Sequence, residues 1–587
     1  MSSAASPDLG RRARSFGDLL QRRADSAPSA TAVVFLEDDG SEYPLTYAEL
    51  HRRASDIAAA IEAGGNDANE PVLLLFPPGP DYVAALFGCF YAGAPAVPAY
   101  PPIPTRMSRT LPRLLAIFED SAAGAVLTIG ALREVVEQWF QPSGDTAPPR
   151  VIATDELART EGGRASAGVA PDTLALLQYT SGTTSSPRGV MLTHEHLLSN
   201  CARVYHSLGI SAEDSAVIWL PPYHDLGLIG GIMQSVYAPM SCVLMSPMTF
   251  LRRPIVWLRE MSRNRATTTG GPNFAYDLCV RRTTPEEREG LDLSNWEIAF
   301  TGAEPVSAQT IEDFSRTFAP YGFRREAFYP CYGLAEATLI VSGGTRMAGP
   351  KVIRVNRDRL EGEGVAETTD DPARVLVGCG TLPSEHRAVI VDPSSLRARP
   401  EGHVGEIWFS SPSVAAGYWR KPLETQAVFE AVTSDTGEGP FLRTGDLGFV
   451  LDGEVFVTGR LKDVMVINGR NYHPEDIEKA CEAAVAGLRP SCGAVFGVHS
   501  DSGPESMVVV YEVAGEDADD HADTLEAIRR TVSMDVNVQP EAVVLIQPRT
   551  LPKTSSGKIQ RFLCREQYFA DELDVVARWD APRRASR

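Results

Sequence analysis

Short apolar runs alternate with helical patterns through roughly the first 460 residues of this 587-residue chain. Residues 71–76, 123–129 and 172–180 are typical of buried strands, because they are short and almost wholly apolar. Residues 45–63 predict a helix that opens with the capping signature Thr46-x-x-Glu49. This alternation favours helices on both faces of mostly parallel sheets. We therefore expect an α/β fold.

The pattern changes after about residue 340. Residues 343–378 are polar and Gly-rich, and we expect an insertion or linker there. Short strand-like runs follow up to about residue 460, which predicts a small β-barrel-like subdomain. Beyond this point helices and strands alternate on a smaller scale. We expect a large domain over 1–460, containing the insertion, and a small α+β domain over 461–587.

Charge and composition restrict the function. Lys and Arg number 55 against 76 Asp and Glu, a net charge of −21, which disfavours binding to nucleic acid or anionic membranes. The nine cysteines are scattered without a CxxC pair, as in a cytoplasmic enzyme with reduced thiols. The N-terminus lacks the apolar core of a signal peptide. Residues 82–102 contain four prolines, so we expect a buried helix, strand and loop and no stable membrane insertion.

One loop is unusually rich in hydroxyl groups. Residues 179–190 read YTSGTTSSPRGV, and six of these twelve are Ser or Thr. The loop follows the predicted strand 172–180 and precedes a helix that Thr193 can cap. Hydroxyls and glycine N–H groups are donors that can surround a polyphosphate, although the spacing of a Walker loop is missing here and at 555–558. Taken alone, such a loop is more often a solvated turn.

Six motifs in order relate the chain to a known superfamily. After the loop come FTGAEPV (300–306), YGLAEAT (332–338), RTGDLG (443–448), GRLKD (459–463) and LPKTSSGKIQR (551–561). They resemble motifs of the adenylate-forming superfamily of acyl-CoA synthetases, peptide-synthetase adenylation domains and luciferases. The resemblance covers about residues 15–570. The loop departs from the common pattern at Ser185, often Gly, and at Arg188, often Lys.

Within this superfamily the chain looks most like the fatty acyl-AMP ligases. The stretches 219–231 and 269–278 and the insertion after YGLAEAT carry this likeness. It implies an enzyme that uses ATP and Mg²⁺ to convert a fatty acid to acyl-adenylate, and then loads a phosphopantetheine thiol. In that group the insertion is associated with poor use of coenzyme A. Too few residues follow Lys558 for a fused carrier, so we expect a separate holo-acyl carrier protein or a carrier domain of a polyketide or peptide synthase.

The resemblance also implies a nucleotide site. Its phosphate cradle comprises Thr180, Ser181, Gly182, Thr183 and Thr184. Thr180 and Glu336 are the expected Mg²⁺ ligands, since Mg²⁺ bound to phosphates needs few carboxylates. The adenosine-binding residues are Tyr332, Gly333, Gly302, Ala303, Glu304, Asp446 and Arg460. Asp446 is the expected ribose ligand, because a carboxylate can accept hydrogen bonds from both hydroxyls.

Three further residues have implied roles in catalysis. Lys558 matches the lysine that reaches the α-phosphate and the substrate carboxylate, and Lys462 stands at the hinge about which the small, mobile domain would swing. His224, in WLPPYHDLGLIGG, borders the acyl site by resemblance; a core histidine is the alternative. For Lys558 and Lys462, the alternative is an ordinary solvated lysine on the surface.

The acyl pocket is predicted from composition. Residues 226–251 carry Met233, Met240, Met245 and Met248 with hardly a charge, which suits a tunnel for an alkyl chain as well as an ordinary core. Three other functions remain open: an acyl-CoA synthetase, an amino-acid-activating enzyme in which Asp225 binds the ammonium group, and a non-catalytic nucleotide or lipid-binding protein. The apolar surroundings of Asp225 disfavour the second.

Overall fold

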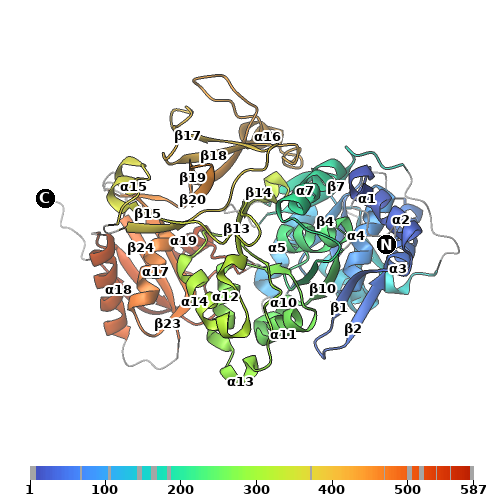
Figure 1. Cartoon of the computed structure of the whole chain (residues 1–587), viewed down its shortest axis with the longest axis horizontal. Helices are drawn as coiled ribbons and strands as arrows, with labels where there is room; N and C mark the ends of the chain where they lie inside the picture. The colour runs from blue at the N-terminus through green and yellow to red at the C-terminus, as the bar shows by residue number, and fades with distance from the viewer. Residues whose placement is uncertain are drawn as a thin grey trace.

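The computed structural model describes residues 8–65, 69–102, 107–141, 148–159, 168–180, 187–238, 240–370, 373–467, 470–498, 506–514, 521–536, 538–554 and 557–581. Two large sheets with their helices form the N-terminal part, and a third, antiparallel sheet lies against them (Figure 1). The N-terminal helices and the C-terminal strands lie at opposite ends of the molecule (Figure 1).

The first large sheet has six strands in the order β6-β5-β3-β4-β7-β8. These strands are Arg150–Ala153, Ala125–Thr128, Val72–Leu75, Ala96–Ala99, Leu174–Tyr179 and Gly189–Thr193. All pair in parallel except β8, which is antiparallel to β7. Val72 and Leu74 pack into the core that contains helix α4, Pro80–Ala92, whereas Leu73 and Leu75 pack with α5, Met107–Ser121, and α6, Gly130–Trp139. Burial on both faces explains why the run 71–76 is continuously apolar.

The second large sheet has eight strands in the order β14-β13-β12-β11-β9-β10-β1-β2. These are Ile340–Gly343, Phe328–Gly333, Ile298–Thr301, Thr268–Gly270, Ser215–Ile218, Ser241–Met245, Thr31–Leu36 and Glu42–Thr46. The inner strands are parallel, and β2 and β14 close the two edges in the antiparallel direction. The predicted mostly parallel α/β architecture is confirmed.

The helices of the N-terminal part cover these sheets. They include α1 Asp8–Arg12, α2 Phe16–Ser26, α3 Tyr47–Ala63, α7 His194–Ser207, α8 Asp225–Gly227, α9 Gln234–Tyr237, α10 Pro247–Arg252, α11 Ile255–Arg263, α12 Asn273–Arg282, α13 Pro285–Arg288 and α14 Ala308–Phe318. Thr46 caps α3 as predicted by accepting the Glu49 N–H at 3.2 Å. The Glu49 carboxylate instead accepts a hydrogen bond from the Tyr43 hydroxyl, so the predicted capping box is only half formed. No described helix is long and apolar enough to cross a membrane.

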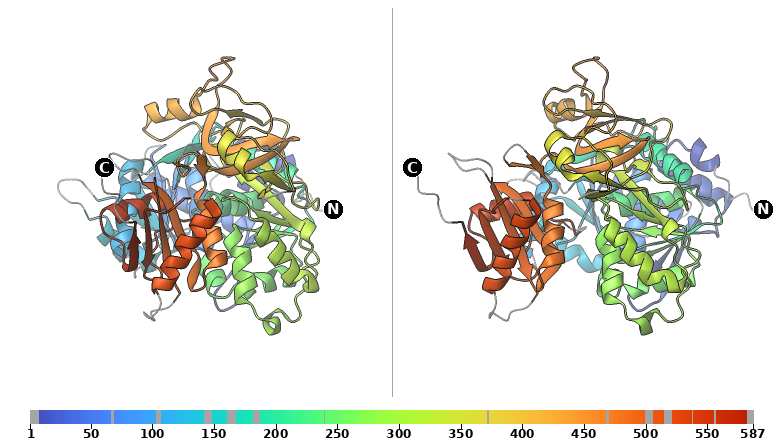
Figure 2. Two further views of the ribbon diagram at one scale, coloured as in Figure 1. Left: turned by 90° about the vertical axis from the view of Figure 1, so that its left-hand side faces the viewer. Right: turned by 60° about the vertical axis from the view of Figure 1, so that its left-hand side comes forward.

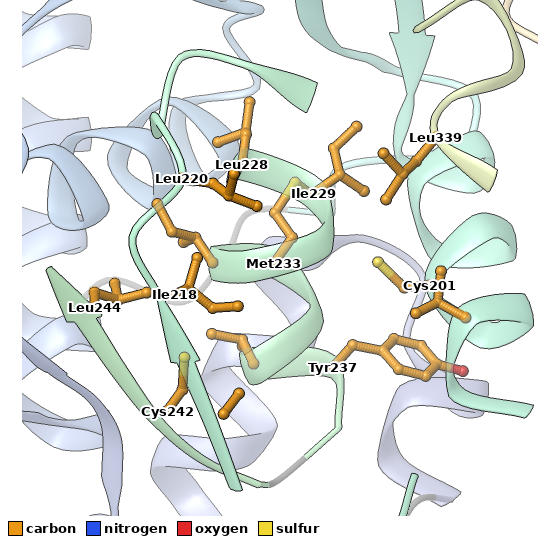
Figure 3. Close-up of a cluster of buried hydrophobic side chains, with 14 of the residues drawn as sticks. Cys201, Ile218, Leu220, Leu228, Ile229, Met233, Tyr237, Cys242, Leu244 and Leu339 are labelled. Carbon is orange, nitrogen blue, oxygen red and sulfur yellow. The ribbon is translucent and has the colours of Figure 1, made fainter. Parts of the chain in front are cut away.

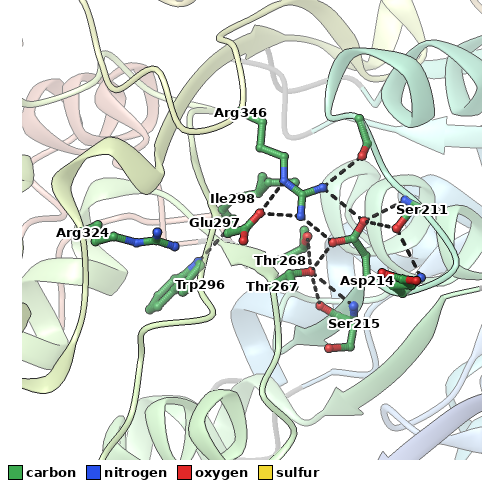
Figure 4. Close-up of polar contacts among 12 residues, drawn as sticks. Ser211, Asp214, Ser215, Thr267, Thr268, Trp296, Glu297, Ile298, Arg324 and Arg346 are labelled. Atoms are coloured by element: carbon green, nitrogen blue, oxygen red, sulfur yellow. Dashed lines mark hydrogen bonds and ion pairs between the residues drawn. The ribbon is translucent and has the colours of Figure 1, made fainter.

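An ionic cluster fixes the starts of three strands in the second sheet (Figure 4). Arg346, after β14, pairs with Asp214 at 2.7 Å, just before β9, and with Glu297 at 2.7 Å, just before β12. The Thr267 hydroxyl, just before β11, donates to Asp214 at 2.7 Å. Burial acts to raise the pKa of Asp214, but the hydrogen bonds from Arg346 and Thr267 outweigh it and lower the pKa overall.

Residues 343–378 are not an unstructured linker. They contain β15, Val352–Asn356, helix α15, Arg357–Glu363, and β16, Ala373–Val377, and the two strands pair antiparallel. The unit packs against the third sheet, whose antiparallel strands are β17 Arg387–Val391, β18 Gly405–Ser410, β19 Leu442–Leu451 and β20 Glu454–Arg460. Val355 and Leu360 bury beside Phe449 and Phe456, and these apolar positions sit within a segment whose polar, Gly-rich composition masked them.

The C-terminal residues form a separate unit at the side of the large sheets (Figure 2). A hairpin of β21, Met465–Ile467, and β22, Arg470–Tyr472, precedes a sheet in the order β23-β24-β25-β26: Leu488–Val498, Ser506–Val513, Ala542–Ile546 and Val575–Asp580. Helices α17, Pro474–Ala484, and α18, His521–Val536, cover one face, and α19, Arg561–Phe569, covers the other.

Candidate functional site

A cavity of about 1980 Å³ lies where the two large sheets, the third sheet and the C-terminal unit meet. Every predicted site residue in the described part of the chain lines it: Thr180, His224, Gly302, Ala303, Glu304, Tyr332, Gly333, Glu336, Asp446, Arg460, Lys462 and Lys558. Ser181, Gly182, Thr183 and Thr184 lie outside the described residues. Positions separated by almost 380 residues of sequence therefore converge, as a shared site requires.

The hydroxyl-rich loop spans the end of a β-hairpin. Strands β7 and β8 pair up to Tyr179 and Gly189, and the Thr180 N–H donates to the Arg188 carbonyl at 3.3 Å. Strand β8, which we did not predict, thus stands between the loop and helix α7. The five residues of β8, GVMLT, are too few to predict a strand when the partner strand is not known. Thr193 caps α7 as predicted.

Asp446, on β19, is a buried carboxylate with two polar partners from other strands. One carboxylate oxygen accepts a hydrogen bond from the Tyr332 hydroxyl at 2.7 Å, and the other pairs with Arg460 Nε at 3.2 Å. Burial and the adjacent Asp446 raise the pKa of Tyr332, so its hydroxyl remains a donor. Arg460 stands opposite Asp446 in the β19–β20 register, and Asp446 is the main cause that raises the pKa of this guanidinium.

The segment Gly302–Glu304 forms one wall beyond the carboxyl end of β12. A side chain at Gly302 would place its Cβ 2.4 Å from the Cys331 carbonyl oxygen, so only glycine fits. Ala303 has a φ of 66°, which turns the backbone into the cavity wall. Because β12 and β13 are parallel neighbours, their ends bring this segment beside Tyr332 and Gly333. A crevice at the carboxyl ends of parallel strands is a common place for a nucleotide.

Glu336 is held by a tyrosine that sequence reasoning missed. The Tyr418 hydroxyl donates to Glu336 Oε1 at 2.9 Å, and the Arg188 guanidinium lies 5.5 Å from the centre of the Tyr418 ring. Arg188 itself pairs with Glu424 at 2.9 Å. Burial raises the pKa of Glu336, while the Tyr418 hydrogen bond favours its ionised form. No motif that we singled out included Tyr418.

Lys558 projects from the C-terminal unit into the same cavity. Its backbone N–H donates to Thr554 Oγ1 at 3.0 Å. Burial lowers the pKa of the Lys558 ammonium, and Asp225 is the strongest group that opposes this. Burial also acts to raise the pKa of Asp225, but His224, whose Nδ1 lies 2.5 Å from Asp225 Oδ1, and Lys558 bring it down to about 2. Asp225 is therefore ionised and already has cationic or hydrogen-bonding neighbours.

Arg561 ties the Lys558 segment to the start of the C-terminal unit. It forms ion pairs with Glu478 at 2.7 Å, Glu475 at 2.9 Å and Asp463 at 3.4 Å. Asp463 directly follows Lys462, whose exposed side chain lines the cavity and whose pKa is lowered by burial and by Arg188. Arg561 is the last residue of the motif LPKTSSGKIQR, but we assigned it no role from the sequence.

The cavity has an apolar part, called the apolar branch below, beside a π-helical turn, η4, at Leu228–Met233. Figure 3 shows the side chains of Leu228, Ile229 and Met233 from this turn in a cluster of buried apolar residues. The branch is lined by Val204, Leu208, Ile210, Ala216, Ile218, Gly230, Met240, Leu339 and Ile340. A Cβ at Gly231 would lie 2.9 Å from Ile218, and a Cβ at Gly230 would lie 3.2 Å from Leu339, so these glycines allow close packing. Of the four methionines, Met240 and Met248 line the cavity, whereas Met233 and Met245 belong to the surrounding core.

Comparisons with known proteins agree with this geometry. Residues 20–419 match the AMP-binding enzyme family. Medium-chain-fatty-acid–[acyl-carrier-protein] ligase JamA of Moorena producens is 43% identical over 573 residues, 96% of each chain. Long-chain-fatty-acid–AMP ligase FadD26 of Mycobacterium bovis is 35% identical over 586 residues, 96% of this chain and 99% of the other.

A solved structure also has the same fold. It is the fatty acyl-adenylate ligase from Legionella pneumophila in complex with acyl adenylate and pyrophosphate, which is 36% identical to this chain with a TM-score of 0.73 and covers 97% of this chain and 98% of its own. The family match spans most of the chain, and the similarity to JamA spans nearly all of it. The chain therefore belongs to the AMP-binding enzyme family and has the fold of the adenylate-forming enzymes.

Proposed function

We propose that this protein is a fatty acyl-AMP ligase that activates a fatty acid with ATP and transfers the acyl group to the phosphopantetheine thiol of a carrier protein. The observation that carries the proposal is that the apolar branch and the residues around Asp446 open into one cavity. An alkyl chain in the branch and a nucleotide beside Tyr332 would bring their reacting ends together near Lys558. JamA and FadD26 are named for these activities, which supports the assignment.

In the first step the fatty carboxylate oxygen forms a bond to the α-phosphorus while the bond to the pyrophosphate oxygen breaks. Both reactants are anionic, so their approach requires fixed positive charge. Lys558 would supply it, and Asp225 opposes the effect of burial, which lowers the pKa of this lysine. Asp446, fixed by Tyr332 and Arg460, would accept the ribose hydroxyl hydrogens, while the Gly302–Glu304 backbone would flank the adenine.

The residues at Glu336 fit a magnesium ion. Glu336 and the Thr180 hydroxyl offer hard oxygen ligands at the cavity wall, and phosphate oxygens would supply the others. Burial raises the pKa of Glu336, and a bound cation would favour the ionised form of this carboxylate. A bound Mg²⁺ would neutralise phosphate charge and polarise the α-phosphate. The contribution of the chain is to hold Glu336 in place through Tyr418.

The second step requires access for a pantetheine arm. The proposed division of the chain is a large domain over 1–460 and a small domain over 461–587, with Lys462 as the hinge. Rotation there would withdraw Lys558 and open a path for the thiol, which attacks the acyl carbon and releases AMP. In the structure Arg374, from β16, pairs with Asp476 of α17 at 3.0 Å, so the segment 343–378 contacts the unit that would move.

Two alternative functions differ from this proposal in the thiol or in the acid that the enzyme uses. A putative fatty-acid–CoA ligase, fadD25 of Mycobacterium tuberculosis, is 36% identical over 581 residues, so coenzyme A is the main alternative thiol. An amino-acid substrate is disfavoured, because His224 and Lys558 already balance the Asp225 charge and the adjoining branch is apolar. These rivals predict different products.

The test is to incubate the protein with ATP, Mg²⁺ and decanoic acid, with either coenzyme A or a holo-acyl carrier protein, and to measure product masses. We expect acyl-AMP without a thiol and acyl-carrier when the carrier is added. Efficient formation of acyl-CoA would reject the carrier preference, and pyrophosphate exchange with amino acids but not fatty acids would reject the substrate class.

A further inference from the structure

Gln234 is a buried polar residue in the apolar branch of the cavity. It begins helix α9, directly after the π-helical turn, and it lines the cavity. Its exposed fraction is 1%, and neither the amide oxygen nor the amide nitrogen has a hydrogen-bond partner. A buried primary amide that leaves both its donor and its acceptor unused is uncommon in a folded protein.

The neighbouring polar groups are already engaged elsewhere. The Ser235 hydroxyl donates to the Ile232 carbonyl at 2.8 Å, the Tyr237 carbonyl accepts from Arg23 at 2.8 Å, and the Tyr329 hydroxyl donates to the Ser207 carbonyl at 3.4 Å. Gln178, another glutamine of the cavity, donates its amide N–H to the Tyr223 carbonyl at 3.0 Å, and only its amide oxygen has no partner. Among these groups, Gln234 alone leaves both its donor and its acceptor unused.

The position of Gln234 relates its amide to the substrate. Gly230, four residues earlier, lines the same branch and packs closely against Leu339. The branch has only apolar walls at Val204, Ile218 and Ile340. A plain alkyl chain would fill such a branch through burial of apolar surface alone, and would leave the Gln234 amide without a partner.

We propose that Gln234 determines specificity by hydrogen bonding to a hydroxyl group on the acyl chain, so that the preferred substrate is a monohydroxy fatty acid. The inference rests on the proposed activation of a fatty acid. A hydroxyl can donate to the amide oxygen and accept from the amide nitrogen, and therefore satisfies both unused atoms. A keto group would satisfy the nitrogen only, and an unsubstituted chain neither. The expected order of preference is hydroxy, keto, unsubstituted.

The experiment compares fatty acids of one length. Acyl-AMP formation is measured for decanoic acid, for monohydroxydecanoic acids with the hydroxyl at successive carbons, and for the matching keto acids. We expect one hydroxyl position to give a kcat/KM about tenfold or more above that of decanoic acid, because a site that hydrogen-bonds a substrate hydroxyl disfavours the analogue that lacks it.

Gln234→Leu and Gln234→Met remove the amide and keep the volume similar. In these variants we expect the hydroxy acid to lose its advantage while decanoic acid is used as well as or better than before. The melting temperature without ligand is expected to stay or rise, since an unpaired buried amide is removed. Met240→Leu, in the same cavity, is the matched control and should change the two acids equally.

Three results would overturn the inference. They are a wild-type enzyme that uses decanoic acid as well as every substituted acid, a Gln234→Leu variant in which both acids decline in parallel, or a fall in melting temperature, which would indicate a structural role for the amide. These results are separable from failure of the proposed function, because that failure would appear as an absence of acyl-AMP with every fatty acid.

Discussion

The hydroxyl of Tyr418 donates a hydrogen bond of 2.9 Å to the carboxylate of Glu336, which links the loop before helix α16, Pro422–Phe429, to the carboxylate that we assign to Mg²⁺. The Tyr418 ring also lies under the guanidinium of Arg188, which is near the C-terminal end of the hydroxyl-rich loop. One aromatic residue therefore connects the proposed metal ligand with Arg188. We regard Tyr418 as a positioning residue.

Tyr418→Phe should weaken the proposed metal site without removing it. A hydrogen bond to a charged group contributes about 1.5–3 kcal/mol, so we expect acyl-AMP formation to fall by roughly 10- to 100-fold at limiting Mg²⁺. Raising the Mg²⁺ concentration should recover much of the activity. The measurement is the initial rate as a function of Mg²⁺ concentration.

Tyr43→Phe is the matched control for this variant, because the Tyr43 hydroxyl donates to Glu49 at 2.8 Å on the surface of the protein. Its Mg²⁺ dependence should equal that of the wild type. If Tyr418→Phe also kept the wild-type Mg²⁺ dependence, Tyr418 would have no role in holding a metal ligand.

Arg346→Met should destabilise the second sheet. Arg346 pairs with Asp214 and Glu297, and Asp214 is almost fully buried, so loss of the arginine leaves a poorly compensated carboxylate. We expect a loss of about 3 kcal/mol at pH 7 in the free energy of unfolding, measured by urea denaturation. Arg324→Met, which removes an exposed hydrogen bond to the Ser294 carbonyl, should change it by less than about 0.5 kcal/mol.

The pH dependence of this effect has a defined sign. The pKa of Asp214 is lowered in the folded protein, so its stabilising contribution is complete above the unfolded value of 3.8 and is lost as the pH falls through the folded value. The difference between wild type and Arg346→Met should therefore be largest near pH 7 and shrink below pH 3.8. A difference that stays constant across this range would show that Asp214 is not the group involved.

The sequence predicted the parts of the fold that local patterns specify. The apolar run 71–76 forms β3, and Thr46 caps helix α3, because each signal lies within a few residues. Strand β8 was not predicted, because so short a segment is recognisable as a strand only from its pairing with β7. Residues 343–378 were also misjudged as a possible linker, since their few buried residues pack against Phe449 and Phe456 from a distant strand.

The candidate site was predicted to a similar extent. Motifs identified Asp446, Glu336 and Lys558, and these residues meet in one cavity. Tyr418 and Gln234 were not identified, because a single tyrosine or glutamine carries no local pattern and acquires a role only from its neighbours in space. For Gln234 the informative feature is the absence of a hydrogen-bond partner, which only coordinates can reveal.

Gly230→Phe should shorten the chains that the enzyme accepts. A Cβ at this position already lies 3.2 Å from Leu339, so a larger side chain would block the apolar branch. Each methylene excluded from the branch forfeits roughly 0.8 kcal/mol, so loss of four should lower kcat/KM for a long acid by about two orders of magnitude. Short acids should be little affected, as measured by acyl-AMP formation across a length series. Equal losses for all lengths would place the acyl chain elsewhere.

The account depends most directly on Lys558, because this lysine of the C-terminal unit lines the cavity and interacts electrostatically with Asp225. The decisive measurement is the rate of acyl-AMP formation by Lys558→Ala, together with its ATP affinity by calorimetry. Lys351→Ala, which alters an exposed lysine paired with Asp452 at 3.5 Å, is the control. We predict a fall on the order of 100-fold or more in the rate for Lys558→Ala, with ATP still bound. Turnover at the wild-type rate would contradict the proposal that two parts of the chain converge to join a carboxylate to the α-phosphorus.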